Sequence, residues 1–175
     1  MAELALDALV VVATVVAMEG FAWLTHRYVM HGRLGWGWHR SHHEDTDGHF
    51  ERNDLYAVVF TVFAGALIAA GIAGVWPLRQ LGLGLMVYGI LYFAVHDGMV
   101  HQRWPFRYVP RRGYLKRLVQ AHRLHHAVGG RDGCVSFGFL YAPPPRVLKE
   151  RLKANGTLRA PVGDDAAPGP AARTG

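Results

Sequence analysis

Two short stretches of the chain repeat one arrangement of histidines. HRSHH covers residues 39–43 and HRLHH covers residues 122–126, so each places imidazoles at positions i, i+3 and i+4. On an α-helix these positions share one face, and the last two, which are adjacent in sequence, are about 100° apart. Each stretch can therefore offer ligands to two different metal ions. Imidazole binds metals in its neutral form.

Two further stretches carry histidine pairs with a longer spacing. HRYVMH covers residues 26–31 and HDGMVH covers residues 96–101, and each has histidines at i and i+5. On an α-helix such positions are roughly 140° apart. Two arrangements are therefore open: Gly32 and Gly98 loosen the helix, or each histidine of a pair serves its own metal.

The four groups together predict a site for two metals. Ten imidazoles exceed the four ligands of a structural zinc. The Glu-x-x-His repeats of soluble di-iron bundles and the HExxH motif of zinc proteases are both absent. Imidazole suits iron, although spacing alone does not choose iron over zinc. The predicted ligands are His26, His31, His39, His42, His43, His96, His101, His122, His125 and His126. The remaining histidine, His49, is expected to be a polar anchor at the membrane interface.

Long apolar segments must position these histidines. Three segments, at about 4–25, 55–76 and 79–100, approach or exceed the roughly 20 apolar residues that a bilayer span needs. Pro77 lies between the second and third segments, which predicts a tight helical hairpin. Small residues in the second segment are expected to let helices pack closely. The predicted fold class is therefore all-α: an integral membrane helical bundle with a histidine-rich di-metal site.

The positive charges predict the orientation of this bundle. Only Arg79 of the 19 Lys and Arg residues lies in the hairpin turn, and none precedes the first span. Because positive loops stay in the cytoplasm, we expect an external N-terminus, with the 27–54 connection and the C-terminus cytoplasmic. The acidic residues Glu3 and Asp7 argue against a secretory signal. The site would then lie on the cytoplasmic face of the membrane.

The other segments are assigned simpler roles. The basic and aromatic stretch 102–117 is expected to contact lipid headgroups rather than nucleic acid. Residues 1–154 form the predicted membrane-embedded domain, and 155–175 form a tail, rich in Pro, Gly and Ala, that we expect to be disordered. The single cysteine, Cys134, permits no internal disulfide and is interpreted as a packing residue.

Several polar residues are candidates to support the histidines. Glu19 lies seven positions before His26, so on one helix face. It either bonds a ligand imidazole or polar groups inside the bundle, or pairs with a basic residue near the interface. Asn53 and Asp54 suit the N-cap of the second span. Metal-bound imidazoles usually donate their other N–H to a carboxylate or carbonyl. The acidic candidates for this role are Glu44, Asp45, Asp97 and Asp132.

These motifs resemble those of a known family. The stretches HRYVMHG, GWGWHRSHHE, NDLYAVVF, HDGMVHQRWPFRYVPRRGYLKRLVQAHRLHHA and GRDGCVSFGFLYAPP, which fall between about Phe21 and Pro144, are similar to the bacterial β-carotene 3-hydroxylases. These belong to the fatty acid hydroxylase family of membrane di-iron enzymes. The histidine motifs alone are shared with desaturases and sterol oxidases. HDGMVHQRWPFRY and GRDGCVSFGFLYAPP are more specific to carotene hydroxylases.

The resemblance implies a function. It implies two non-haem irons held by the ten motif histidines, O2 as co-substrate and a ferredoxin or similar electron donor. It also implies a hydroxyl on C3 of β-ionone rings, converting β-carotene through β-cryptoxanthin to zeaxanthin, with the carotenoid arriving from the bilayer. The family is commonly drawn with four spans; the run 134–142 is too short to cross, but it has the composition to dip into the bilayer.

Two other functions are carried as alternatives. One is a hydroxylase or desaturase for acyl lipids or sterols in the same superfamily. The other is a histidine-rich metal transporter or sensor, which should place ligands along a path near mid-membrane. The interiors of the three apolar segments contain no histidine, which argues against a transporter.

Overall fold

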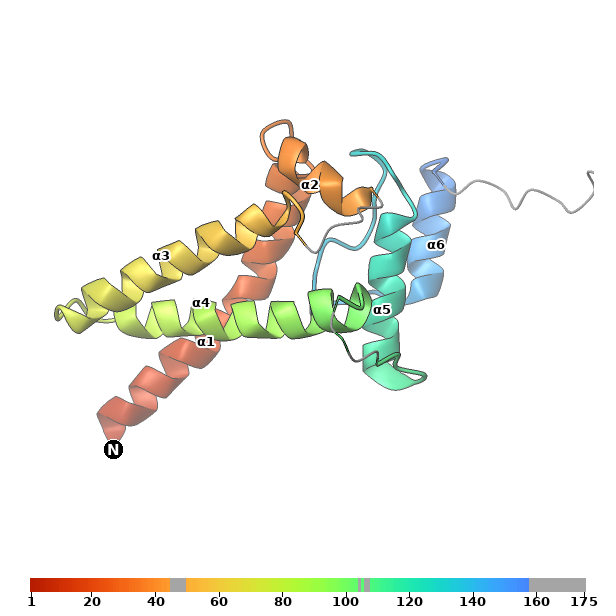
Figure 1. Cartoon of the computed structure of the whole chain (residues 1–175). Coiled ribbons are helices and arrows are strands. Elements are labelled where there is room, and N and C mark those ends of the chain that lie inside the picture. The colour runs from red at the N-terminus through yellow and green to blue at the C-terminus, as the bar shows by residue number, and fades with distance from the viewer. Residues whose placement is uncertain (45–49, 104, 106–107, 158–175) are drawn as a thin grey trace, which may run out of the picture.

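The computed structural model describes residues 1–44, 50–103, 105 and 108–157 (Figure 1). This part of the chain contains helices and connecting segments and no strand, so the predicted all-α class is confirmed. The elements are α1 (Ala2–Leu24), η1 (Thr25–Met30), α2 (Trp36–His43), α3 (Asp54–Ile72), α4 (Leu78–Tyr92), η2 (Phe93–Val100), α5 (Gly113–His126) and α6 (Pro145–Ala154). The expected disordered tail lies, from residue 158 onward, outside the described residues.

Within the part of the chain that the structure describes, three helices are long and apolar enough to cross a membrane. They are Ala2–Met30, Asp54–Ile72 and Leu78–Val100, which match the three predicted spans. The first is longer than predicted because η1 continues α1 without a break. The second is shorter, since the chain turns after Ile72 and Gly74 adopts a left-handed φ of +101°.

Close approach of backbones holds these helices together. It involves glycines of α4 as well as some of the small residues predicted in the second span, such as Ala64. A Cβ on Gly82 of α4 would lie 2.7 Å from the carbonyl oxygen of Ala64 in α3, so only glycine fits there. α1 packs on the same helix at Gly84, where a Cβ would meet Thr14 at 2.5 Å. Figure 1 shows α3 and α4 side by side, with α1 crossing them.

The start of α1 and the hairpin turn are tied together at one end of the bundle. Asp7 accepts a hydrogen bond from the indole N–H of Trp76 at 3.3 Å and forms an ion pair with Arg79 at 3.6 Å. The N-terminus and the turn therefore lie on the same side. The histidines lie at the opposite end, where η1, α2, η2 and α5 meet.

A non-helical segment returns from α5 to the membrane helices. Glu19 in α1 accepts hydrogen bonds from the backbone N–H groups of Phe139, Leu140 and Tyr141 at 2.8 to 3.0 Å, and from the hydroxyl of Tyr88 at 2.8 Å. Of the two roles considered for Glu19, bonding polar groups inside the bundle is therefore the observed one. Extended backbone beside a membrane span needs such acceptors, because lipid offers none.

Candidate metal centre

Two π-helical turns bring each i, i+5 pair onto one side. The backbone N–H of His31 donates to the carbonyl of His26 at 2.9 Å, and His101 donates to His96 at the same distance. An i→i+5 bond widens the turn, so the 140° separation expected for an α-helix does not apply here. π-turns of this kind are frequent at functional sites. The helix is loosened, and both members of a pair join the same group of ligands.

The ten predicted histidines converge on two neighbouring positions. Nitrogens of His26, His31, His39 and His125 lie within 4.8 Å of one another; we call these residues the first histidine group. Nitrogens of His42, His96, His101 and His122 do the same, as the second histidine group. His43 and His126 lie between the groups, with ring centroids 4.6 Å apart. His49 lies outside the described residues.

Each HxxHH helix contributes to both groups, although it does so through its i and i+3 members and not through the adjacent pair that the spacing indicated. From α2, His39 joins the first group and His42 the second. From α5, His122 joins the second group and His125 the first. The two helices thus exchange ligands across the centre, which places two sites side by side rather than one large one.

In the first histidine group, every Nδ1 donates outward to an oxygen. The acceptors are the carbonyl oxygens of Phe137, Arg131 and Val135 and the side-chain oxygen of Asn53, at 2.7 to 2.9 Å. A neutral imidazole carries one proton, so each Nε2 is left with a lone pair. These lone pairs face one another: Nε2 of His39 lies 3.1 Å from that of His26 and 3.1 Å from that of His31.

Such an arrangement fits a cation at its centre. Facing lone pairs repel unless a positive ion lies between them, and an outward Nδ1–H bond is the usual companion of a metal-bound imidazole. Nε2 of His42 and Nε2 of His43 are buried and have no hydrogen-bond partner among the described residues. Buried polar atoms are rarely left unpaired. The donor set therefore fits two metal ions with nitrogen ligands.

Burial keeps these imidazoles neutral. It lowers the pKa of His39 to about 3, that of His43 to about 4 and that of His101 to about 4. Burial and neighbouring histidines lower the pKa of His126 to about 2. Neutral imidazole is the form that binds metal, so no deprotonation opposes binding at neutral pH.

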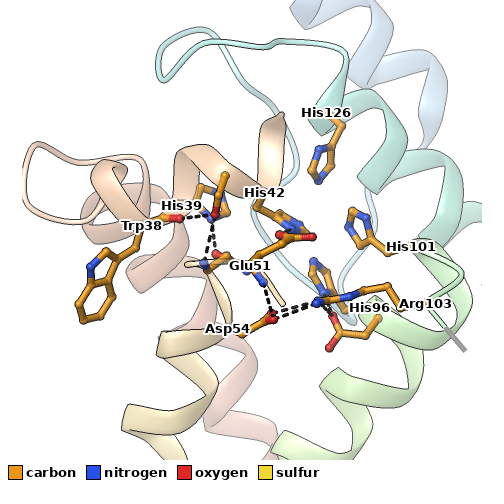
Figure 2. Close-up of polar contacts among 12 residues, drawn as sticks. Trp38, His39, His42, Glu51, Asp54, His96, His101, Arg103 and His126 are labelled. Atoms are coloured by element: carbon orange, nitrogen blue, oxygen red, sulfur yellow. Dashed lines mark hydrogen bonds and ion pairs between the residues drawn. The ribbon is translucent and has the colours of Figure 1, made fainter. Parts of the chain in front are cut away.

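Acidic and amide side chains support the second histidine group and its neighbours (Figure 2). Asp97 accepts from Nδ1 of His96 at 2.7 Å, which confirms one of the four acidic candidates. Glu44 instead pairs with Arg40, and Asp132 with Arg131, both at the surface. Asp45 lies outside the described residues.

Two acceptors were not among the candidates. Glu51 accepts from Nδ1 of His42 at 3.0 Å, and Asn53 accepts from His39. Asn53 occupies the predicted N-cap position of α3, but its side chain does not cap that helix. Only its position just before the second span could have drawn attention to it, and that signal favours a cap equally well.

Arg103 joins this network from the segment after η2. It forms a two-pronged ion pair with Asp54 at 2.8 and 2.9 Å and lies 3.8 Å from Asp97. The hydrogen bonds to Asp54 raise the pKa of its guanidinium. Arg103 therefore positions the acceptor of His96 (Figure 2).

Cys134 lies beside His43 and His125, yet it behaves as a packing residue. It is buried in the core around α5 and α6, and its thiol points to the carbonyl oxygens of Val128 and Gly130. Burial raises its thiol pKa to about 12. A protonated thiol is a poor ligand, and the interpretation made from sequence stands.

Two cavities flank the histidines. An apolar one of about 370 Å³ lies among α1, α3 and α4 and ends at Tyr92, Asp97 and Phe139. A polar one of about 450 Å³ is lined by five histidines together with Glu51, Arg103 and Arg123. The centre thus lies between a membrane-side apolar space and a polar opening.

Comparison with known proteins identifies the family. The sequence profile described as "Fatty acid hydroxylase" matches residues 11–142. The chain belongs to the fatty acid hydroxylase family. Relatives named "Beta-carotene hydroxylase" occur in Paracoccus sp. strain PC1 (63% identical, over 86% of this chain and 93% of the relative) and Pantoea ananas (59%, over 91% of each). Another is found in Pseudescherichia vulneris (64%, over 84% and 83%). No solved structure matches the chain.

Proposed function

We propose that this chain is a β-carotene 3-hydroxylase. It converts a ring C–H and O2, with two electrons and two protons, into a ring C–OH and water. The electrons come from a one-electron iron–sulfur donor of the ferredoxin class. Because β-carotene has two equivalent rings, both react in turn, through β-cryptoxanthin to zeaxanthin.

The observation that carries this proposal is the centre itself: two groups of inward-facing histidine nitrogens at the end of an apolar cavity. Relatives named for β-carotene hydroxylation, 59 to 64% identical over most of their length, support the substrate. Transport is disfavoured, since the ten histidines gather at one end of the bundle rather than along a path.

We assign the metals as two non-haem irons. The first histidine group and His43 would hold one, and the second histidine group and His126 the other. When bound, such irons supply the O2-derived oxidant needed to break an unactivated C–H bond. The chain's own residues fix seven of the ten imidazoles through outward hydrogen bonds from Nδ1. The apolar cavity excludes water on the membrane side. Glu51, which lines the polar cavity and bonds His42, is placed to pass protons inward.

The polar cavity is assigned to the cytoplasmic side of a bacterial inner membrane. The bundle's opposite end contains Arg79 as the only basic residue of the hairpin turn. Reporter fusions after Gly48 and after Leu78 test this orientation. A cytoplasmic signal is expected from the first and an external one from the second; the reverse pattern would contradict it.

An acidic electron donor would dock on the basic residues that precede and begin α5. Arg111, Arg112, Lys116 and Arg117 are exposed at the start of α5 and before it. Complementary charge mainly speeds encounter with an acidic partner. Arg103, by contrast, forms an ion pair with Asp54 of the same chain.

Expression in cells that accumulate β-carotene tests the function. We expect β-cryptoxanthin first and zeaxanthin later, with no product when ligands are removed. If carotene stayed unchanged while acyl lipids were oxidised, the proposal would be wrong and the protein would be an acyl-lipid hydroxylase.

A further inference from the structure

The apolar cavity is built from the membrane helices themselves. Its lining comes from α1, η1, α3, α4, η2 and Phe139, and Asp97 is the only charged residue among the lining residues. Aromatic side chains are prominent on its walls, including Tyr56, Phe60 and Phe93. Its volume of about 370 Å³ falls at the lower end of ligand pockets, roughly 300–1,000 Å³. A cavity of this size admits one end of a long carotenoid, not the whole molecule.

The inner end of this cavity is one side chain away from both histidine groups. Phe139 lines the cavity. Its ring stacks on His26 of the first group, with centroids 5.3 Å apart, and lies edge-on to His96 of the second group, with centroids 5.4 Å apart. Tyr92, also in the lining, stacks on His96 at 4.5 Å. The cavity therefore points at the boundary between the two groups.

We propose that this cavity receives one β-ionone ring end-on, and that this orientation selects C3. The inference rests on the proposed function. The polyene joins the ring at C6, and C3 lies directly across the ring from C6. A ring that enters with its polyene trailing toward the bilayer therefore presents C3 first. Because none of the described lining residues is a histidine, the ring must displace the Phe139 side chain, while Glu19 holds the backbone of that residue in place.

Glycines on two helices provide a matched test. Gly89 in α4 lines the cavity, and a Cβ there would meet nothing within 4 Å. Gly65 in α3 has the same open surroundings but is not among the lining residues. A Gly89→Phe side chain can fill the cavity, whereas Gly65→Phe points elsewhere. The two variants carry the same substitution in similar exposed helical positions.

The experiment measures iron content, retained β-carotene and hydroxylated product for wild type and both variants in lipid nanodiscs. Gly89→Phe is expected to retain iron but to lower carotene retention and turnover by about tenfold or more, equivalent to about 1.4 kcal/mol. Gly65→Phe should match wild type. If Gly89→Phe retained β-carotene and turned it over as wild type does, this inference would be overturned while the proposed function would stand. A wild-type protein that neither binds nor oxidises carotene would overturn the proposed function first.

A widened cavity tests the orientation separately. Phe60 lines the cavity and packs edge-to-face with Phe21, with ring centroids 6.1 Å apart. Phe60→Ala should let the ring tilt, so that 2-hydroxy or 4-hydroxy products accompany the 3-hydroxy product. Product hydroxylated only at C3 would overturn the claim that the cavity wall sets the position.

Discussion

The imidazoles of His43 and His126 stack on each other, with 22° between their planes. They come from α2 and α5, and each also contacts one histidine group. The ring centroid of His43 lies 4.9 Å from that of His125 in the first group. Nε2 of His126 lies 2.9 Å from Nε2 of His122 in the second group. This pair therefore joins the two groups at the middle of the centre.

Replacing either member of this pair should disable the centre. His43→Ala or His126→Ala removes a nitrogen ligand and leaves a gap that water fills, so we expect loss of nearly all turnover and lower iron content. His49→Ala, outside the repeated motifs, should retain most activity. The measurement is product and iron per protein at matched membrane expression. Full activity in both ligand variants would rule out the assignment, and inactivity with normal iron would move them to proton transfer.

The outward hydrogen bonds should matter almost as much as the ligands. Asn53→Leu preserves side-chain size but removes the acceptor for Nδ1 of His39. Loss of such a partner typically costs 10- to 100-fold in metal affinity or activity. We expect weaker iron retention during dialysis against a chelator. Asn155→Leu, which alters a surface bond to Gly133, is the control. Equal iron loss in both variants would contradict a specific role for Asn53.

Glu19 should be required for assembly rather than for chemistry. Glu19→Ala leaves the backbone N–H groups of the 139–141 segment without an acceptor, and each buried unsatisfied donor costs roughly 1–3 kcal/mol. We expect a lower unfolding temperature and lower iron content, because the same segment holds His26 through Phe137. Glu19→Gln retains one acceptor oxygen, so its unfolding temperature and iron content should lie between those of wild type and Glu19→Ala. A Glu19→Ala protein as stable as wild type would disprove this.

Spacing along helices predicted much of this centre. The i, i+3, i+4 pattern placed three imidazoles of each HxxHH on one face, and His39 and His42 of one helix do join different groups. The adjacent member, His43, lies between the groups instead. The three apolar segments likewise predicted the spans. These features depend on local periodicity, which a single sequence displays directly.

Other features depend on contacts between distant parts of the chain. The wider turn between His26 and His31 follows from the demand that both face one site, and an α-helical wheel predicts the opposite. The acceptors from the segment after α5 are backbone carbonyls, which any residue type supplies. The bond from Asn53 to His39 competes with a helix cap, so residue type alone could not separate the two roles.

The metal-free protein should lose stability on mild acidification. The pKa values of His39, His43 and His101 are about 3, 4 and 4 in the fold, against 6.5 for free histidine. Below about pH 6.5 these histidines become protonated in the unfolded chain but stay neutral in the folded chain. The free energy of unfolding is therefore highest above that pH and falls as the pH is lowered toward 4. The unfolding temperature of the metal-free protein should therefore fall as the pH is lowered from 7 to 5, a range in which most carboxylates stay ionised. A constant unfolding temperature would contradict buried neutral imidazoles.

The most direct test of the account is iron stoichiometry measured together with product on one purified sample. Protein reconstituted with Fe²⁺ in nanodiscs containing β-carotene, O2, a ferredoxin and its reductase should hold about two irons per chain, one for each histidine group. It should form β-cryptoxanthin and then zeaxanthin in proportion to bound iron. Undiminished carotene hydroxylation by zinc-loaded or metal-free protein would contradict the account.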